Sequence, residues 1–455
     1  MLFDEAFCKE QLTGLESDQN NFFENLARKL GSAALTSSVD HYVKYQKIGQ
    51  GTFGEVFKVR HKETKQHYAL KKIRMEQEKE GFPITALREI RILRSLDHEN
   101  IVALKEICHS TPTEKNNYIP QFYLVFEFCD HDLAGLSKQV DFSDAIKKAI
   151  MKQLLTGVYY LHKNNIIHRD LKAANILIDR NGVLKIADFG LARCTLKSLK
   201  PDRPNRYTSR VVTLWYRPPE ILLNDRHYGK PVDLWGAGCI MAELWTKYAI
   251  MQGDNEINQL KLIINLCGSI SPVVWPNVVN LEAYQEAKLP LDIKRHVREK
   301  LMTQISCSLA VDLIDKLLVL DPAKRMDAEA ALNHEYFFAE PGPADLRVFS
   351  KSGTTYLEFL STPHAHPPAI PGASNRAPPS LHPVNSHRGS MPSIRGQSGS
   401  RPGPYHPYPP QNAQAHNPGH HYNSHSHHKG QAKQNQPSHG RGRGAPDDCI
   451  YDRIY

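Results

Sequence analysis

The apolar positions of the first third of the chain predict a small β-sheet with one helix inserted in it. From Tyr42 onward, short runs of β-branched and aromatic residues are separated by glycines and polar turns, which is a pattern typical of strands. After Pro83, apolar residues recur at three- and four-residue steps as far as Leu96, which predicts a helix that begins at the proline. The predicted strands are 45–48, 55–59, 68–73 and, with a fully buried pattern, 121–126.

The pattern that follows is helix-rich as far as about Phe338. The sequence therefore predicts an α+β fold of two lobes, a small β-rich lobe with one helix and a large helical lobe. Beyond Ser361 the composition changes to Pro, Gly, Ser, Asn, Gln and His, which bury too little apolar surface to offset the entropy of ordering, so this tail is predicted to be disordered. The predicted organisation is an N-terminal extension at 1–41, the two-lobed domain at 42–338, a linker at 339–360 and the tail at 361–455.

The N-terminal extension contains one helix-like stretch. Its apolar residues Phe22, Phe23, Leu26 and Leu30 follow three- and four-residue steps, and Gly31 ends the pattern. A frayed surface helix is the simpler interpretation, and a docking element is the alternative.

The formal net charge of +9 is distributed unevenly. Residues 1–40 total −4, residues 41–360 total +7, residues 361–446 carry eight bases and no acid, and residues 447–455 total −2. The basic domain and tail favour acidic partners. The eight cysteines show no paired spacing, which argues against a zinc site or a disulfide framework and for a reducing compartment. Because no signal peptide and no run of about 20 apolar residues is present, we expect a soluble intracellular protein without membrane association.

Two polar motifs carry the chemistry. The first is His-Arg-Asp-Leu-Lys-Ala-Ala-Asn at 168–175, and Asp188 opens an Asp-Phe-Gly motif shortly after it. Asp170 can accept the proton of an attacking hydroxyl, and Lys172 can neutralise a transferring phosphate. Asn175 and Asp188 supply the hard oxygen ligands that Mg²⁺ prefers. The motifs predict ATP-dependent phosphoryl transfer with Mg²⁺.

A glycine-rich turn precedes these motifs between two predicted strands. Its small residues would let backbone N–H groups approach nucleotide phosphates, although such a turn alone is a weak signal. Lys71 on the next strand could reach the α- and β-phosphates, and Glu89 in the predicted helix could pair with Lys71. The residues of the turn are Gly49, Gln50, Gly51, Thr52, Phe53 and Gly54.

Together with Pro218-Pro219-Glu220, these motifs follow one another in a fixed order, and six ordered matches by chance are far less probable than one. From about Tyr42 to Phe338 the chain resembles the eukaryotic protein kinase family. The family usually has alanine in the place of Pro218, and the same departure is common in its cyclin-dependent branch. The resemblance implies that Glu220 pairs with Arg325 and that Asp233 braces the backbone of the catalytic loop.

A second resemblance is narrower. The segment Gly81–Glu89 resembles the cyclin-contacting helix of the cyclin-dependent kinases that act in transcription elongation, and segments 205–208, 211–217 and 234–241 resemble the same branch. This implies a nuclear, cyclin-activated serine/threonine kinase with a T-type cyclin as its partner. Its expected substrates are the heptad repeats of the largest subunit of RNA polymerase II and elongation factors.

The same resemblance assigns substrate and regulatory residues. Val211, Val212 and Arg217 are expected to shape a pocket that favours proline after the target residue. Thr208 is the expected activating phosphorylation site, because a phosphate there would add about −1.5 to −2 charges. The arginines expected to bind that phosphate are Arg88, Arg169 and Arg193.

The resemblance also assigns the nucleotide-base site. Glu127 and Cys129 would offer backbone groups to adenine, Phe126 would be the gatekeeper, and Asp132 would lie near the ribose. The apolar walls around the ring would be Ile48, Val56, Ala69 and Leu177.

Other interpretations remain open at this stage. A related transcriptional cyclin-dependent kinase is one alternative. A catalytically silent scaffold is another, although it would have no chemical need for Lys71, Glu89, Asp170, Lys172, Asn175 and Asp188 together. Twelve of the 23 histidines fall in the tail, where a pH-sensitive spacer is favoured over metal capture, and weak association with RNA is an intermediate hypothesis.

Overall fold

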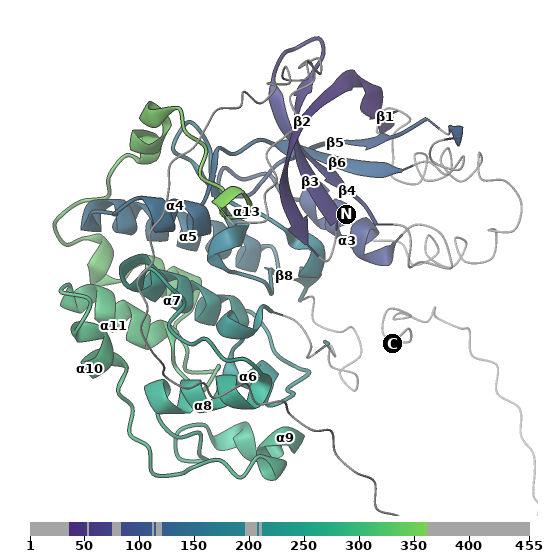
Figure 1. Ribbon diagram of the computed structural model, residues 1–455. Helices are drawn as coiled ribbons and strands as arrows, with labels where there is room; N and C mark the ends of the chain where they lie inside the picture. Colours follow the sequence, from purple (N-terminus) through teal and green to yellow (C-terminus); the bar gives the residue numbers. More distant parts are fainter. Residues whose placement is uncertain are drawn as a thin grey trace, which may run out of the picture. The chain divides into compact units, whose positions relative to one another are not determined.

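The chain has a β-rich lobe joined to a helical lobe (Figure 1), which confirms the predicted fold class. All of the described residues belong to one of the two compact units into which the chain divides. The second unit, residues 369–447, lies outside the described residues, as does the predicted disorder of the tail beyond Ser361. In the part that is described, no helix is long and apolar enough to cross a membrane. This computed structural model describes residues 36–51, 54–74, 83–111, 113–114, 121–195, 207–208 and 212–361.

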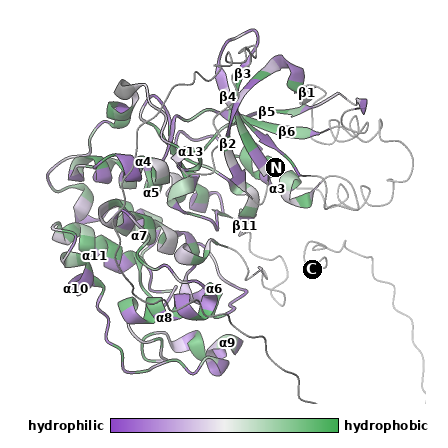
Figure 2. Cartoon of the chain, viewed as in Figure 1, coloured by the Kyte–Doolittle hydropathy of each residue, from purple (hydrophilic) through white to green (hydrophobic). Residues whose placement is uncertain are grey.

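The small lobe is built on a six-stranded sheet with the order β1-β5-β6-β4-β3-β2. Neighbouring strands are antiparallel, except that β1 runs parallel to β5. Four of these strands were predicted from the sequence, whereas the polar strand β1 and the half-polar strand β5 were not. β6 is largely apolar in colour in Figure 2, as expected for an inner strand of the sheet. The strands are β1 (Thr36–Ser38), β2 (Tyr42–Gly51), β3 (Gly54–His61), β4 (His67–Lys72), β5 (Leu104–His109) and β6 (Phe122–Glu127).

The helix predicted after Pro83 is present as α3 (Ile84–Arg94). Its buried side chains include Ile90 and Leu93, which share one face at the helical period, together with the acidic Glu89. A buried glutamate on a helix needs a partner, because an uncompensated charge is costly in the interior. The helix is therefore placed to bring a carboxylate to the interior of the lobe.

The large lobe is organised around α5 (Asp144–Lys163) and α7 (Pro231–Thr246). Ser143 caps α5 by accepting a hydrogen bond from the Ile146 amide, and His162 and Lys163 suit its negative C-terminal end. α7 is buried on nearly every side, which explains why its sequence is apolar all round. The remaining helices are α4 (Leu133–Gln139), α6 (Pro219–Leu222), α8 (Glu256–Cys267), α9 (Glu282–Glu286), α10 (Val297–Met302), α11 (Ser308–Leu317), α12 (Ala328–Leu332) and α13 (Glu358–Ser361).

Short strands and 3₁₀ turns connect the longer elements. A three-stranded sheet has the order β10-β9-β7, and β11 pairs with β8. These strands are β7 (His131–Asp132), β8 (Ile166–Ile167), β9 (Ile176–Ile178), β10 (Leu184–Ile186) and β11 (Arg193–Cys194). The 3₁₀ turns are η1 (Val39–His41), η3 (Ala173–Asn175), η4 (Phe189–Leu191), η5 (Leu214–Tyr216), η6 (Pro276–Asn280), η7 (Glu335–Phe337) and η8 (Leu346–Ser352).

A buried ion pair joins α6 to the loop before α12. Arg325 donates from Nη1 and Nη2 to the two carboxylate oxygens of Glu220 at 2.7 and 2.9 Å, and both side chains are almost completely buried. The pairing expected from the resemblance is confirmed. Such a bidentate ion pair neutralises both buried charges and also fixes the relative orientation of the two side chains.

We expect Glu220→Gln to lower the free energy of unfolding by about 3 kcal/mol, because it leaves the buried Arg325 guanidinium without a counter-charge. The measurement is the urea midpoint of the purified chain. Glu329→Gln is the control, since its carboxylate is 60% exposed and pairs with Lys163 only at the surface. Equal midpoint shifts in the two variants would contradict the importance of burial here.

Candidate active site

An ion-pair triad connects the two lobes. Lys71 Nζ donates to Glu89 Oε1 at 2.7 Å and to Asp188 Oδ1 at 3.0 Å. Burial alone would lower the pKa of Lys71, but the two carboxylates raise it above its usual value, so the ammonium stays charged. The same ammonium holds the pKa of Asp188 below its usual range against the effect of burial. The triad aligns β4, α3 and the Asp-Phe-Gly segment.

Strand register places the glycine-rich turn over this triad. Gly49 on β2 pairs with Val56 on β3, and Val56 pairs with Lys71 on β4, so the three positions lie abreast. Gly54 has φ +146°, and a Cβ there would lie 1.9 Å from the Lys72 carbonyl oxygen, so only glycine fits. Gln50 and Gly51 are exposed beside it, whereas Thr52 and Phe53 lie outside the described residues.

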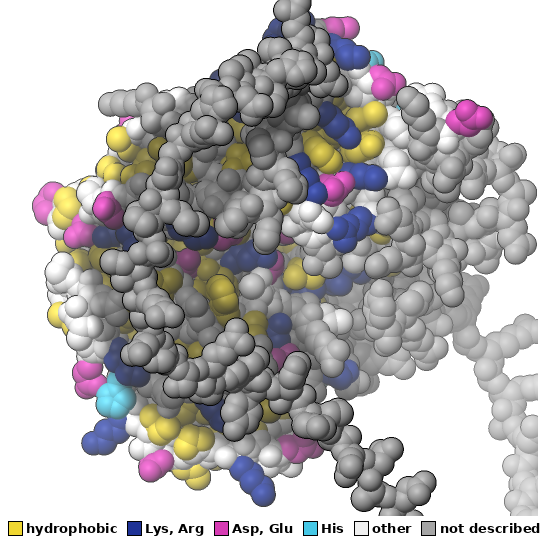
Figure 3. All heavy atoms as spheres, in the orientation of Figure 1, with side chains coloured by type: hydrophobic (Ala, Val, Ile, Leu, Met, Phe, Trp, Pro, Cys, Tyr) yellow, Lys and Arg dark blue, Asp and Glu magenta, His cyan; other side chains and the backbone are white. Residues whose placement is uncertain are grey.

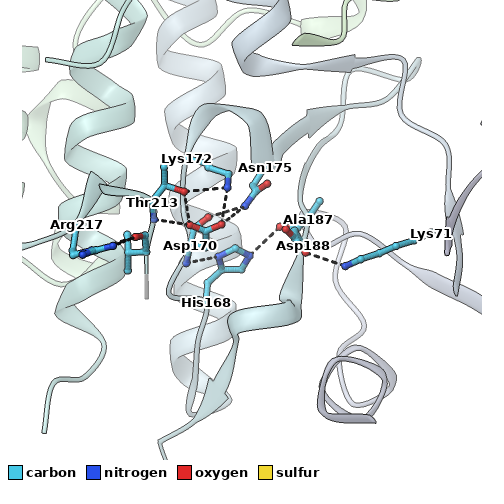
Figure 4. Close-up of polar contacts among 10 residues, drawn as sticks. Lys71, His168, Asp170, Lys172, Asn175, Ala187, Asp188, Thr213 and Arg217 are labelled. Carbon is cyan, nitrogen blue, oxygen red and sulfur yellow. Dashed lines mark hydrogen bonds and ion pairs between the residues drawn. The ribbon is translucent and has the colours of Figure 1, made fainter. Parts of the chain in front are cut away.

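Asp170 lies at the centre of a dense hydrogen-bond network (Figure 4). Its Oδ2 accepts from Lys172 Nζ at 2.8 Å and from Asn175 Nδ2 at 3.2 Å. Its Oδ1 accepts from both the amide and the hydroxyl of Thr213, at 3.0 and 2.9 Å. Lys172 also donates to Thr213 Oγ1 at 3.1 Å, which ties the catalytic loop to the segment before η5. The network fixes a nearly buried carboxylate whose oxygens face a lysine and a hydroxyl.

The backbone of the catalytic loop is held from beneath by α7. Asp233 accepts from the amides of His168 and Arg169 at 2.9 and 2.8 Å, and its Oδ2 is also 2.9 Å from His162 Nε2. The bracing role expected of Asp233 is thus confirmed. Arg169 has φ +68°, a left-handed conformation that costs energy for a residue with a side chain and that these bonds stabilise.

The neighbouring His168 has a defined tautomer. Its Nδ1 accepts from the Asp170 amide at 3.3 Å, so Nε2 carries the proton and donates to the Ala187 carbonyl at 3.0 Å. His168 thereby joins the catalytic loop to the residue before Asp188.

Two side chains of the site, Asn175 and Asp188, carry oxygens that suit a metal ion. Asn175 uses its Nδ2 to donate to the Asp170 carbonyl at 2.9 Å, which leaves Oδ1 as a possible ligand. Asp188, at φ +64°, is ionised and contacts Lys71 through one oxygen. This donor set fits Mg²⁺, which is usually bound by one or two protein oxygens together with substrate phosphates and water. Elsewhere in the described ranges, no cluster of three or more His, Cys, Asp or Glu side chains is arranged to hold a metal ion.

The residues expected around the nucleotide base come from β2, β3, β4, β6, β7 and β9 and from the segment after β6. Phe126 is buried at the end of β6, opposite Ala69 of β4, and Cys129 is buried just beyond it. Ile48, Val56, Ala69 and Leu177 are all partly exposed, as apolar side chains that line an accessible cleft should be. The side chain of Glu127 accepts from the Ala103 amide at 2.8 Å and pairs with Lys185 at 3.1 Å.

Three arginines gather near Thr208. Burial lowers the pKa of Arg193, and the charges of Arg169 and Arg88 lower it further. Arg169 donates from Nη1 to Tyr228 Oη at 2.6 Å, while its buried Nη2 has no hydrogen-bond partner among the described residues. Tyr228 Oη in turn donates to the Thr208 carbonyl at 2.8 Å, and the Thr208 side chain is exposed. The cluster gathers positive charge near an exposed threonine side chain.

The predicted substrate pocket has an unusual backbone. Val212 has φ +66°, which is a strained conformation for a β-branched residue. Its carbonyl accepts from Arg217 Nε and Nη2 at 3.2 and 3.0 Å, and Arg217 is anchored in turn by Glu256 at 2.6 Å. Val211 lies outside the described residues.

Two features of this site were not predicted from the sequence. One is Thr213, whose contact with Asp170 joins positions 43 residues apart. The other is the segment around Tyr356, which packs on β7: the Asp132 amide donates to the Tyr356 carbonyl at 3.0 Å, and the Glu358 amide donates to Asp132 Oδ2 at 2.8 Å. Because Asp132 Oδ1 also accepts from the Gly135 amide, both oxygens are engaged. The buried Leu357 was the available sequence signal in the predicted linker.

Comparison with known proteins identifies the family. The sequence signature of the protein kinase domain matches residues 42–337, and cyclin-dependent kinase 9 of Homo sapiens is 57% identical over 328 residues, 71% of this chain and 88% of that protein. The chain belongs to the cyclin-dependent branch of the protein kinase family. Cyclin-dependent kinase 9 of Danio rerio is 56% identical over 345 residues, 74% of this chain and 92% of that protein. A chain of the yeast RNA Pol II CTD kinase CTDK-1 complex has a TM-score of 0.60 and 39% identity, covering 68% of this chain and 97% of that one.

These findings confirm the resemblance read from the motifs. The chain is a cyclin-dependent serine/threonine protein kinase, and protein kinases use ATP with a divalent metal ion. Of the segment Gly81–Glu89, which suggested the branch, residues 84–89 belong to α3, the helix that presents Glu89 to Lys71.

Proposed function

We propose that a T-type cyclin activates this kinase and that it transfers the ATP γ-phosphate to Ser/Thr-Pro sites. The proposed substrates are the heptad repeats of the RNA polymerase II largest subunit and elongation factors, in the nucleus. The names of the related proteins support this choice, since one is a kinase of the polymerase C-terminal domain and others are cyclin-dependent kinase 9.

The observation that carries the preference for proline is the Val212 carbonyl. A substrate residue with a free N–H after the target would need an acceptor near this backbone, but Arg217 already occupies the carbonyl. Proline has no N–H and loses nothing there, whereas another residue would bury an unsatisfied donor at a cost of roughly 1–3 kcal/mol. That difference corresponds to a preference of about 5- to 150-fold.

The proposed mechanism assigns one task to each polar group. Asp170 orients the attacking hydroxyl and accepts its proton, while Lys172, held by Asp170 and Thr213, stabilises negative charge on the transferring phosphate. Lys71, fixed by Glu89, binds the α- and β-phosphates. Asn175 and Asp188 would hold Mg²⁺, which when bound neutralises charge on the β- and γ-phosphates.

The proposed tail function is separate. The eight bases of residues 361–446, with no acid among them, would allow weak, salt-dependent association with RNA. This segment lies outside the described residues, so the proposal rests on its composition alone.

The test is phosphorylation of a heptad peptide by the full chain, with and without a T-type cyclin. We expect activity that depends on the cyclin and falls at least about fivefold when alanine replaces the proline after each target residue. A serine-to-alanine peptide is the control for the target position.

Three other results of this assay would each contradict a different part of the proposal. Activity that requires a different cyclin would move the enzyme to a related transcriptional kinase. Equal rates on the proline and alanine peptides would contradict the role of the Val212 carbonyl. No activity with bound cyclin and phosphorylated Thr208 would favour a catalytically silent scaffold.

A further inference from the structure

The positive charge of the kinase domain is concentrated in the first strands of the small lobe. Residues 42–74 carry nine lysines and arginines against two glutamates, a net charge of +7. This equals the whole excess of residues 41–360, so residues 75–360 are balanced. Only Lys71 among these nine bases is committed to the active site. The positions of the other eight bases are not explained by the active site.

Three of these bases, Lys44, Lys47 and Lys72, share the face of the sheet that is turned away from Lys71, and Arg74, just after β4, is close enough for its charge to act on Glu55. Lys72 lies directly opposite Tyr123, and Lys47 opposite Phe57, so their side chains share a face with these rings. Lys44 Nζ lies 4.6 Å from the Phe57 ring centroid and 5.0 Å from that of Tyr123. We call Lys44, Lys47, Lys72 and Arg74 the outer basic patch.

The outer basic patch is short of negative charge. Glu55 is the carboxylate that pairs with this patch in the described part of the chain: it contacts Lys47 at 2.6 Å, and its pKa is lowered by Lys47 first and also by Lys72 and Arg74. Burial and the charge of Lys72 lower the pKa of Lys44. Within the described part of the chain, no carboxylate forms an ion pair with Lys44, Lys72 or Arg74. Figure 3 shows basic side chains among apolar ones where Figure 1 draws β2, β3 and β4.

A segment of complementary charge is tethered beside this face. Residues 1–35 carry six acids against three bases, and their one apolar stripe contains Phe22, Phe23, Leu26 and Leu30. The segment leads into β1, which pairs with β5 and is further held by a hydrogen bond of 2.9 Å from Ser37 Oγ to Glu106 Oε2. Its C-terminal end is therefore fixed at one edge of the sheet.

The reach of the segment matches the position of the patch. β6 is the second neighbour of β1 in the sheet and β4 the third, so they lie about 10 and 14 Å away at the usual strand spacing. The five residues 31–35 can span up to roughly 17 Å. A helix over residues 22–30 can thus reach Tyr123 on β6 and Lys72 on β4.

We propose that residues 22–30 dock in cis as an amphipathic helix on the outer basic patch, with the apolar stripe against the partly exposed Phe57 and the acidic side chains of residues 1–35 near Lys44 and Lys72. A second copy of the same face would bring positive charge against positive charge. A free acidic partner would compete with a tethered segment whose effective concentration is of the order of millimolar. The extension is then part of the kinase surface and shields the patch from other acidic chains.

The test uses the full chain with a photo-crosslinking amino acid at position Phe23, and mass spectrometry locates the crosslinks. We expect them on β3, β4 and β6, with a yield that falls as salt is raised. Lys44→Glu together with Lys72→Glu should lower the yield at least about tenfold, a change of 1.4 kcal/mol or more in docking. Lys62→Glu together with Lys65→Glu, in the exposed turn between β3 and β4, is the matched control and should leave the yield unchanged.

A charge swap and a mixing experiment complete the test. Glu24→Lys added to the Lys44→Glu, Lys72→Glu chain should recover part of the lost yield, whereas Glu24→Lys alone should lower it. Mixing isotope-labelled and unlabelled chains separates crosslinks within one chain from those between two. Crosslinks between chains, crosslinks scattered over other surfaces, or a yield unaffected by the patch substitutions while circular dichroism shows a folded protein would each overturn the proposal.

Discussion

Asp188→Asn is expected to lower kcat/KM for phosphoryl transfer by at least roughly 1,000-fold in the cyclin-bound enzyme. The substitution removes the only carboxylate charge among the two proposed Mg²⁺ ligands, while asparagine keeps an oxygen that can still accept from Lys71. Fold stability should therefore change much less than activity. The measurement is steady-state phosphorylation of a heptad peptide over a range of Mg²⁺ concentrations, together with a thermal melt.

The control for this prediction is Asp141→Asn. Asp141 is fully exposed and pairs with Lys247 at 3.0 Å, so the substitution makes the same chemical change far from the phosphate site. It should leave the rate within about twofold of the unmodified enzyme. If Asp188→Asn retained more than a tenth of the activity at saturating Mg²⁺, Asp188 would not be an essential ligand.

Local sequence patterns were sufficient for the elements that bury apolar side chains at a regular period. Strand β6, with its run of five buried residues, and helix α3, with Ile90 and Leu93 on one face, were both predicted close to their observed positions. Strand β1 was missed because Thr36–Ser38 is a polar triplet whose order comes from pairing with β5. Its position depends on pairing with β5, which is far away in the sequence, so a local pattern of apolar residues cannot predict it.

The same contrast holds within the site. Asp170, Asn175 and Asp188 were predicted because motif spacing places them in known loops. Thr213 was not, because its hydroxyl becomes relevant only when the chain folds back onto Asp170. The engagement of Asp132 by the Glu358 amide is similar, since the two positions are 226 residues apart. The sequence predicts the reactive groups, and the structure shows which residues hold these side chains in place.

Thr208→Ala is expected to reduce the activity of the cyclin-bound, phosphorylated enzyme by roughly 10- to 100-fold, provided that Thr208 is the phosphorylated residue. Each charge-assisted hydrogen bond from a phosphate to the arginines contributes about 1.5–3 kcal/mol, and one or two such bonds account for this range. The buried Nη2 of Arg169, which has no hydrogen-bond partner within the described ranges, can donate to such an oxygen. The measurement compares phosphorylated, dephosphorylated and Thr208→Ala enzymes at saturating cyclin.

The controls separate the phosphate from the threonine itself. Thr303→Ala changes an exposed threonine in the loop after α10 and should leave the rate unchanged. Arg193→Ala should reduce the difference between the phosphorylated and dephosphorylated enzymes, since it removes one of the three guanidiniums that the phosphate would neutralise. Equal activity of the phosphorylated and Thr208→Ala enzymes would instead mean that the cyclin alone orders the segment.

The arginine cluster explains why phosphorylation of Thr208 should activate the enzyme. Burial, and after it the charges of Arg169 and Arg88, disfavour the protonated form of Arg193 and lower its pKa, so the unphosphorylated arrangement carries an electrostatic cost. A phosphate on Thr208 would replace this repulsion by attraction, because it brings up to two negative charges to a cluster of three arginines. Tyr228 accepts a hydrogen bond from Arg169 and donates one to the Thr208 carbonyl, and Arg169 belongs to the same loop as Asp170. Phosphorylation should therefore stabilise the catalytic loop and the Thr208 segment together, and the thermal midpoint should rise with activity.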